Sequence, residues 1–115
     1  MSEMVKKARK YEMEESMKIA KENRPVYHFS NPVGWMNDPN GFSDYKGEHH
    51  LFFQYYPYAT HWASMHWGHA KSADFIKWEY LPTALAPDQG YDNFGVFSGS
   101  AIEDEEKQIL IYTGV

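Results

Sequence analysis

Apolar and polar positions divide the chain into two unlike parts. Residues 3–22 contain no Gly or Pro and are rich in Glu, Lys, Met and Ala, so we expect one helix there, with Ser2 as its N-cap. The apolar stripe of this helix is weak, because Met4, Ala8 and Tyr11 lie on one face while Met13, Met17 and Ala20 lie on roughly the other. The pattern predicts a peripheral helix that packs on the rest of the molecule.

From Pro25 onward, short apolar runs alternate with turn signals, a pattern typical of β-strands. Three hairpins are predicted, formed by Phe42–Tyr45 with Glu48–Tyr55, Ser64–Ser72 with Lys77–Leu81, and Val96–Glu103 with Gln108–Tyr112. Antiparallel hairpins at such short spacing predict an all-β meander in a sandwich, barrel or propeller. We therefore expect a helical segment at 1–24 and a β domain at 25–115. Because the chain stops directly after a strand-like run, we expect it to be the N-terminal piece of a longer protein.

Length, charge and cysteine content narrow the possible functions. The 115 residues suffice for one small domain, and the absence of cysteine excludes disulfides, zinc–thiolate sites and thiol nucleophiles. The net charge is −5, with +2 in residues 1–24 and −7 in residues 25–115, which argues against a nucleic-acid partner. No apolar run approaches the ~20 residues of a membrane helix, and no signal peptide is visible. We expect a soluble, cytoplasmic protein without a membrane partner.

The segment 35–41, Trp-Met-Asn-Asp-Pro-Asn-Gly, carries the strongest chemical signal. Pro39 forces Asp38 towards extended geometry, and Asn40-Gly41 favours the positive φ angles of a tight turn. The result is a carboxylate at the end of a strand, beside an amide and an indole. Such a set suits a sugar, which has apolar C–H faces and hydroxyl edges. The alternative is an ordinary Asx-Pro turn with a buried Trp.

Together with His28-Phe29-Ser30, this segment closely resembles the opening of glycoside hydrolase family 32, the family of invertases, sucrose-6-phosphate hydrolases and fructan hydrolases. The resemblance covers essentially residues 24–115 and continues in family order through His50-Leu51-Phe52-Phe53-Gln54-Tyr55, Met65-His66-Trp67-Gly68-His69-Ala70, Trp78-Glu79, Leu81-Pro82, Ala84-Leu85-Ala86-Pro87, Phe97-Ser98-Gly99-Ser100-Ala101 and Tyr112-Thr113-Gly114. Family members fold as a five-bladed β-propeller followed by a β-sandwich. The resemblance therefore implies that residues 25–115 form the first blade and part of the next.

The resemblance also implies a reaction. Family members cleave terminal β-fructofuranosyl bonds by a retaining mechanism, and Asp38 matches their nucleophile. Retention requires two carboxyl groups about 5–5.5 Å apart, but the family's acid/base glutamate and its Arg-Asp pair lie beyond Val115. We therefore expect a β-fructofuranosidase acting on sucrose, sucrose 6-phosphate or a short fructan, with no cofactor, and an inactive 115-residue chain in isolation.

By the same resemblance, seven residues are expected to contact the sugar: Trp35, Met36, Asn37, Gln54, Trp62, Phe97 and Ser98. Strand alternation places Gln54 among aromatic side chains, where it needs hydrogen bonds from sugar hydroxyls or from neighbouring backbone. Trp62 lies on a loop where it either contacts substrate or seals an edge of the core. The small residues after Ser98 indicate close approach of a ligand or, alternatively, tight packing near a propeller axis.

Other interpretations of the residues stay open. Six histidines suggest a metal, but His66 and His69 point to opposite faces of a strand, and His49 and His50 also diverge, so we expect no metal site. Fructosyl transfer shares its covalent intermediate with hydrolysis and is an alternative function. A non-catalytic sugar-binding fragment or decayed homologue is a third possibility.

Overall fold

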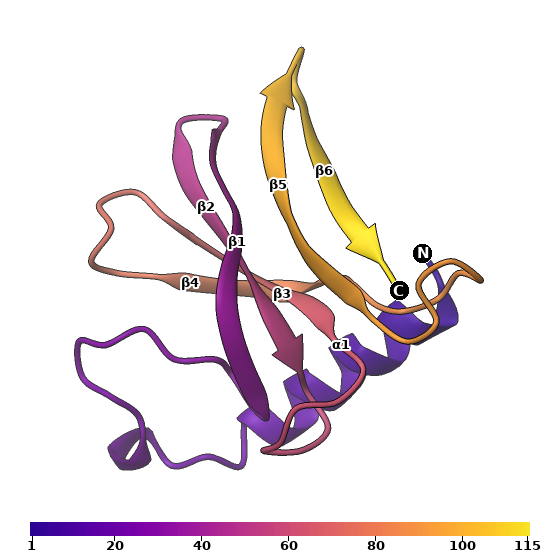
Figure 1. Cartoon of the computed structure of the whole chain (residues 1–115). Helices are drawn as coiled ribbons and strands as arrows, with labels where there is room; N and C mark the ends of the chain where they lie inside the picture. The colour runs from indigo at the N-terminus through magenta and orange to yellow at the C-terminus, as the bar shows by residue number, and fades with distance from the viewer.

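A computed structural model describes all residues, 1–115, and shows a four-stranded antiparallel sheet, a separate two-stranded hairpin and one α-helix (Figure 1). The elements are α1 (Glu3–Ser16), a 3₁₀ turn at Lys21–Asn23, β1 (Trp35–Tyr45), β2 (Glu48–Tyr56), β3 (His66–Ser72), β4 (Glu79–Leu85), β5 (Val96–Asp104) and β6 (Lys107–Gly114). The first four strands form a meander in sequence order, and β5 pairs with β6. This confirms the all-β class with an N-terminal helix and all three predicted hairpins.

The largest difference from the sequence prediction is the start of β1, which lies at Trp35 rather than at Phe42. The extra length carries two β-bulges, between Met36 and Pro39 and between Asn40 and Ser43. Each bulge sets two residues of β1 against one of β2, so the period-2 pattern that reveals a strand is interrupted twice. The second bulge contains Gly41 at φ +53°, and a Cβ there would lie only 2.8 Å from the Phe52 ring.

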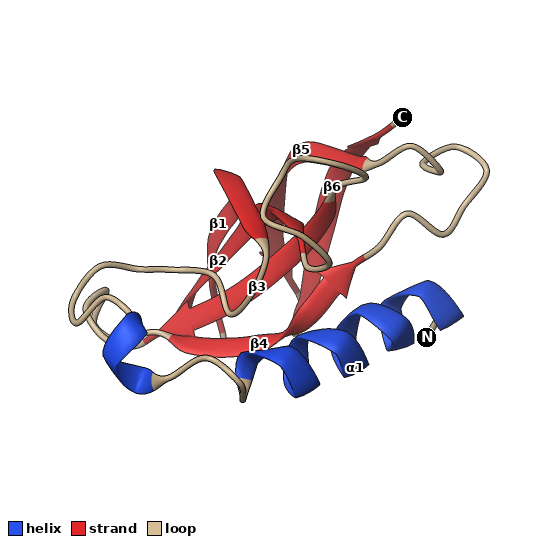
Figure 2. Cartoon of the chain, turned by 90° about the horizontal axis from the view of Figure 1, so that it is seen from below, coloured by secondary structure: helices blue, strands red, loops and turns tan.

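Helix α1 ends at Ser16, so the predicted extent of 3–22 was wrong at its C-terminal end. The N-cap is confirmed, because the Ser2 hydroxyl accepts from the Val5 amide at 3.2 Å. The buried side of the helix, formed by Val5, Ala8 and Glu12, lies along β4 (Figure 2). Residues 17–23 are exposed and gain no such contact, so the sheet surface limits the helix length. The domain boundary at residues 24–25 remains a prediction.

Two helix side chains fasten α1 to Thr83 of β4, the outer strand of the sheet. Arg9 Nε donates to the Thr83 carbonyl at 2.8 Å. The carboxylate of Glu12 accepts from the Thr83 amide at 2.7 Å and from its hydroxyl at 2.9 Å. Burial raises the pKa of Glu12, and the bonds from Thr83 oppose that rise. The helix thereby satisfies backbone groups that an edge strand otherwise leaves unpaired.

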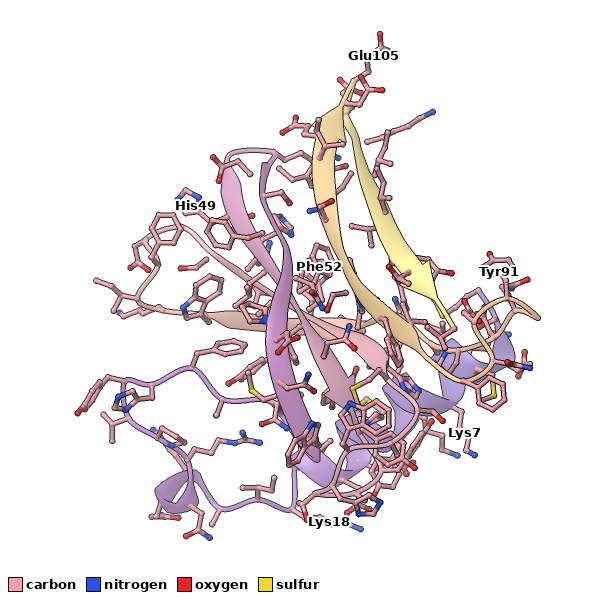
Figure 3. The ribbon with its side chains drawn as sticks, viewed as in Figure 1. Lys7, Lys18, His49, Phe52, Tyr91 and Glu105 are labelled. Atoms are coloured by element: carbon pink, nitrogen blue, oxygen red, sulfur yellow. The ribbon has the colours of Figure 1, made fainter.

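The middle of strand β2, from Phe52 to Tyr55, is buried on both faces, which explains why its apolar residues are consecutive and do not alternate with polar ones. Phe53 and Tyr55 pack with Val33 and Ala70 on one face. On the other face, Phe52 packs with Trp67 and Val96, where the sheet meets the β5–β6 hairpin (Figure 3). This second cluster holds the hairpin against the sheet and places β5 beside β1. No helix in the structure combines the length and apolar character needed to span a membrane.

Candidate active site

The first bulge of β1 positions the candidate nucleophile. Met36 pairs with Tyr55 and Pro39 with Phe53, so Asn37 and Asp38 together stand opposite the single residue Gln54. Bulges of this kind redirect side chains and are frequent beside active sites. Asp38 is exposed, which leaves its carboxylate open to a substrate.

Trp35 and Asn37 form a fixed pair beside Asp38. The Trp35 indole Nε1 donates to Asn37 Oδ1 at 2.9 Å. This bond sets the orientation of the Asn37 amide and leaves its NH₂ group available as a donor. Trp35 pairs with Tyr56 in the ladder, on the same face of the sheet as Gln54. The first bulge and the Trp35 indole therefore lie on the same face of the sheet, the face that β5 covers further along β1.

Gln54 links this face to β5. Its side chain is 3% exposed, and Nε2 donates to the Val96 carbonyl at 3.1 Å. Of the two partners expected for this amide, the structure shows backbone for the NH₂ group. Gln54 thus holds the start of β5 against the bulge that carries Asp38.

Met36 is set apart from the other predicted contact residues. It pairs with Tyr55, on the face opposite Gln54, and its half-buried side chain packs against the cluster of Phe53 and Tyr55. The structure thus places it against the edge of the core, on the face opposite Gln54. Its predicted contact with a sugar remains a prediction.

The start of β5 brings the last three predicted residues together. Ser98 is the extra residue of a bulge, because Phe97 pairs with Thr113 and Gly99 with the adjacent Tyr112. The Trp67 indole donates to the Phe97 carbonyl at 3.0 Å. Trp62 is 53% exposed and meets the Phe97 ring edge-on, with 6.1 Å between ring centroids. An exposed indole of this kind is available for stacking and does not seal the core.

The sequence and the fold were compared with known proteins. The model of the glycosyl hydrolases family 32 N-terminal domain matches residues 28–115. The chain belongs to glycoside hydrolase family 32. It is 53% identical over 96 residues to the sucrose-6-phosphate hydrolase of Zymomonas mobilis, covering 84% of this chain and 19% of that protein. It is 52% identical over 91 residues to the levanase of Bacillus subtilis, covering 79% of this chain and 13% of that protein. The chain thus spans about a fifth or less of the length of these relatives.

Solved structures of the family show the same fold. A family 32 β-fructofuranosidase of Bombyx mori aligns with a TM-score of 0.85 and 48% identity, over 96% of this chain and 23% of that one. An aspartate-to-alanine mutant of that enzyme has been solved in complex with sucrose. The sucrose-6-phosphate hydrolase of Lactobacillus gasseri aligns with a TM-score of 0.77 and 38% identity, over 96% of this chain and 22% of that one. The meander β1–β4 is therefore a propeller blade, and β5–β6 is part of the next.

In this family 32 chain, His66 diverges from His69 and His49 from His50, as the strand pattern predicted. His66 pairs with Tyr55, whereas His69 pairs with Phe52 on the other face. Burial lowers the pKa of both imidazoles to about 4, so they are neutral at physiological pH. His49, labelled in Figure 3, stacks on Phe75 with 3.7 Å between the ring centroids. His50 Nδ1 instead lies 2.8 Å from His69 Nε2, a pairing that the sequence analysis missed and that the register of β2 and β3 explains.

The candidate site lies on an open surface where β1 meets β5. Two of the three cavities lie along α1, and the third is lined by residues between Ile19 and Gly34 together with Thr60. The largest, of about 360 Å³, is bounded by α1, β4 and Pro32. None of them is lined by Asp38, Gln54 or Ser98. The candidate residues therefore form an exposed surface and do not line an enclosed cavity.

Proposed function

We propose that the chain is the N-terminal part of a retaining β-fructofuranosidase that hydrolyses sucrose or sucrose 6-phosphate, with Asp38 as the nucleophile. One observation carries this proposal. An exposed carboxylate stands on a bulge beside the bonded Trp35–Asn37 pair and opposite Gln54. It does so within the segment that matches the family 32 domain.

The proposed reaction has two steps. An Asp38 oxygen attacks the anomeric carbon of the fructosyl unit, and the bond from that carbon to the glucosyl oxygen breaks as this oxygen takes a proton from a general acid. The resulting ester between Asp38 and fructose is then hydrolysed by water, which adds to the same carbon and gives its proton to the same acid/base group. The resemblance to the family implies that this group is a glutamate beyond Val115.

The other side chains have roles that follow from their chemistry. The Trp35 and Trp62 indoles offer apolar surfaces to the C–H faces of the sugar. The Asn37 NH₂ group and the Ser98 hydroxyl are suited to hydrogen bonds with sugar hydroxyls. Gln54 holds β5 in place through its bond to the Val96 carbonyl.

Hydrolysis is preferred to fructosyl transfer because the relatives named above are hydrolytic enzymes. Both reactions pass through the same fructosyl ester, so the structure of this segment serves either one. Product analysis at high sucrose concentration separates them. Free glucose and fructose in equal amounts support hydrolysis, whereas oligofructans formed in place of free fructose support transfer.

The nucleophile is tested in the full-length protein by the variant Asp38→Ala. We expect sucrose hydrolysis to fall by about 10⁴-fold or more, as for removal of other enzymatic nucleophiles. Asp44→Ala is the matched control, because Asp44 is an exposed aspartate at the far end of the same strand. Full activity in Asp38→Ala would contradict the assignment. Comparing kcat/KM for sucrose and sucrose 6-phosphate identifies the preferred substrate.

A further inference from the structure

A buried carboxylate organises the loop that leads from β4 into β5. Asp92 is 1% exposed, and one of its oxygens, Oδ1, accepts from the amides of Asp88 at 3.0 Å and Gln89 at 2.8 Å. Its neighbour Tyr91, labelled in Figure 3, lies on the outer side of this loop and is exposed. The carboxylate thus satisfies two loop amides that have no strand partner.

The second oxygen of Asp92 connects the loop to the hairpin. Oδ2 accepts from the Tyr112 hydroxyl of β6 at 2.7 Å. Burial, together with the bond to Asp92, raises the pKa of Tyr112, so the hydroxyl keeps its proton and remains a donor at neutral pH. Three donors therefore compensate the buried charge of Asp92, and hydrogen bonds to charged groups are the stronger kind.

The loop organised by Asp92 runs directly into the sugar-contact residues. The Asp92 carbonyl accepts from the Gly95 amide at 2.9 Å, and the next amide, of Val96, donates to the Met65 carbonyl at 2.9 Å. Tyr112 pairs with Gly99, immediately after the Ser98 bulge. The Asp92–Tyr112 bond therefore brackets Phe97 and Ser98 from both sides.

We infer that Asp92 is a positioning residue of the fructosyl site, which with Tyr112 holds Phe97 and Ser98 where they contact the sugar. The inference rests on the proposed function, because it assigns a task to the same site. Asp92 does not reach the sugar itself: its carboxylate is buried and is fully engaged by the loop and by Tyr112. Its contribution is a fixed backbone, which matters because small displacements of contact groups greatly lower the rate.

The test uses the full-length enzyme and the variant Tyr112→Phe, which removes the hydroxyl and keeps the ring. Tyr45→Phe is the matched control, because it also removes a phenol hydroxyl that donates a hydrogen bond involving this hairpin: Tyr45 donates to the Glu106 carbonyl at 2.7 Å, at the opposite end of β5. We expect KM for sucrose to rise about tenfold in Tyr112→Phe and to stay within about twofold in Tyr45→Phe, since the loss of one charge-assisted bond corresponds to roughly that factor.

Asp92 itself is tested by a pair of substitutions. Asp92→Ala removes all three contacts, and we expect kcat/KM to fall by about 100-fold. Asp92→Asn keeps an oxygen for the two loop amides and an NH₂ group that can donate to the Tyr112 oxygen, so we expect it to restore most of the lost kcat/KM. A merely structural role would lower the fraction of active enzyme, and hence the apparent kcat, without changing KM. Unchanged KM in both Tyr112→Phe and Asp92→Ala would overturn the inference.

A second readout is independent of hydrolysis. Hydrogen exchange at the amides of Gly95 and Val96 reports directly on the start of β5. We expect faster exchange there in Tyr112→Phe than in the wild type or in Tyr45→Phe, and equal exchange in all three would also overturn the inference. Failure of the wild-type protein to hydrolyse any fructosyl substrate would refute the proposed function instead, and the exchange measurement would still decide the role of Asp92.

Discussion

Gly68 of β3 lies beneath an aromatic ring, and substituting it tests the packing of the blade. It pairs with Phe53 of β2, and both residues are buried. An alanine Cβ at this position would overlap Cε2 and Cζ of the Phe53 ring and lie 2.9 Å from Cδ2. We therefore predict that Gly68→Ala destabilises the protein.

The size of the effect follows from what the ring is able to do. Phe53 is 1% exposed and packs against Val33, Tyr55 and Ala70, so it has no free space to move into. Overpacking of a tight core costs typically about 1–3 kcal/mol. Because the overlap involves two ring carbons, we expect about 2–3 kcal/mol, at the upper end of that range.

The assay is the unfolding free energy of the full-length protein, measured by denaturant titration or as the change in melting temperature. Gly90→Ala is the control, because a Cβ there meets no atom within 4 Å and Gly90 lacks a positive φ. We expect that control to be neutral or more stable by up to about 1 kcal/mol, through lower entropy of the unfolded chain.

A compensating substitution makes the reasoning refutable. Phe53→Leu removes the ring carbons that the new Cβ would overlap. The double variant Phe53→Leu/Gly68→Ala should therefore be more stable than the sum of the single effects, by about 0.5–3 kcal/mol of coupling. Additive single effects, or a Gly68→Ala protein as stable as Gly90→Ala, would show that the contact with Phe53 does not limit this position.

Two further predictions follow from α1 and from the hairpin. Burial raises the pKa of Glu12 above its unfolded value of 4.5, so its contribution to the free energy of unfolding is full below pH 4.5 and is lost as the pH rises through the folded pKa. The variant Glu12→Gln should remove this part of the pH dependence. Identical curves of stability against pH for the variant and the wild type would contradict the prediction. The isolated chain 1–115 should neither hydrolyse sucrose nor unfold cooperatively as a monomer, because Ile102, Ile109 and Ile111 of its hairpin are exposed. A sharp thermal transition of the monomer would refute the prediction on folding, and sucrose hydrolysis that depends on Asp38 would refute the prediction on activity.

The hairpins were predictable because their strands alternate in the ordinary way and are joined by short turns. The start of β1 was not, since the two bulges interrupt the alternation within 35–43 and since Pro and Gly weaken any strand signal. The end of α1 depends on how far β4 extends beneath it, and helix propensities contain no information about that contact. In both cases a contact made by a distant segment determined the boundary.

Part of the candidate site was likewise predictable from the sequence, and part depends on contacts between distant segments. Asp38, Trp35 and Asn37 are close in sequence, so their proximity was predictable from the segment itself. The approach of Phe97 to Trp62, and of Gln54 to Val96, depends on the packing of one blade against the next hairpin. Strand alternation alone assigns Met36 and Asn37 to opposite faces, and the structure shows Met36 packed against the core and Asn37 bonded to the Trp35 indole.

The paired bulges of β1 also bear on insertions and deletions. Eleven residues of β1 span nine of β2, and the two surplus residues are taken up by the two bulges. Deleting one residue from 37–38 would close the first bulge but leave Met36 opposite Tyr55 and Trp35 opposite Tyr56, so both would keep their faces, and the redirection of the side chains at 37–38 would be lost. The extra residue is therefore not needed for strand pairing, and a one-residue deletion there is expected to lower activity more than it lowers stability.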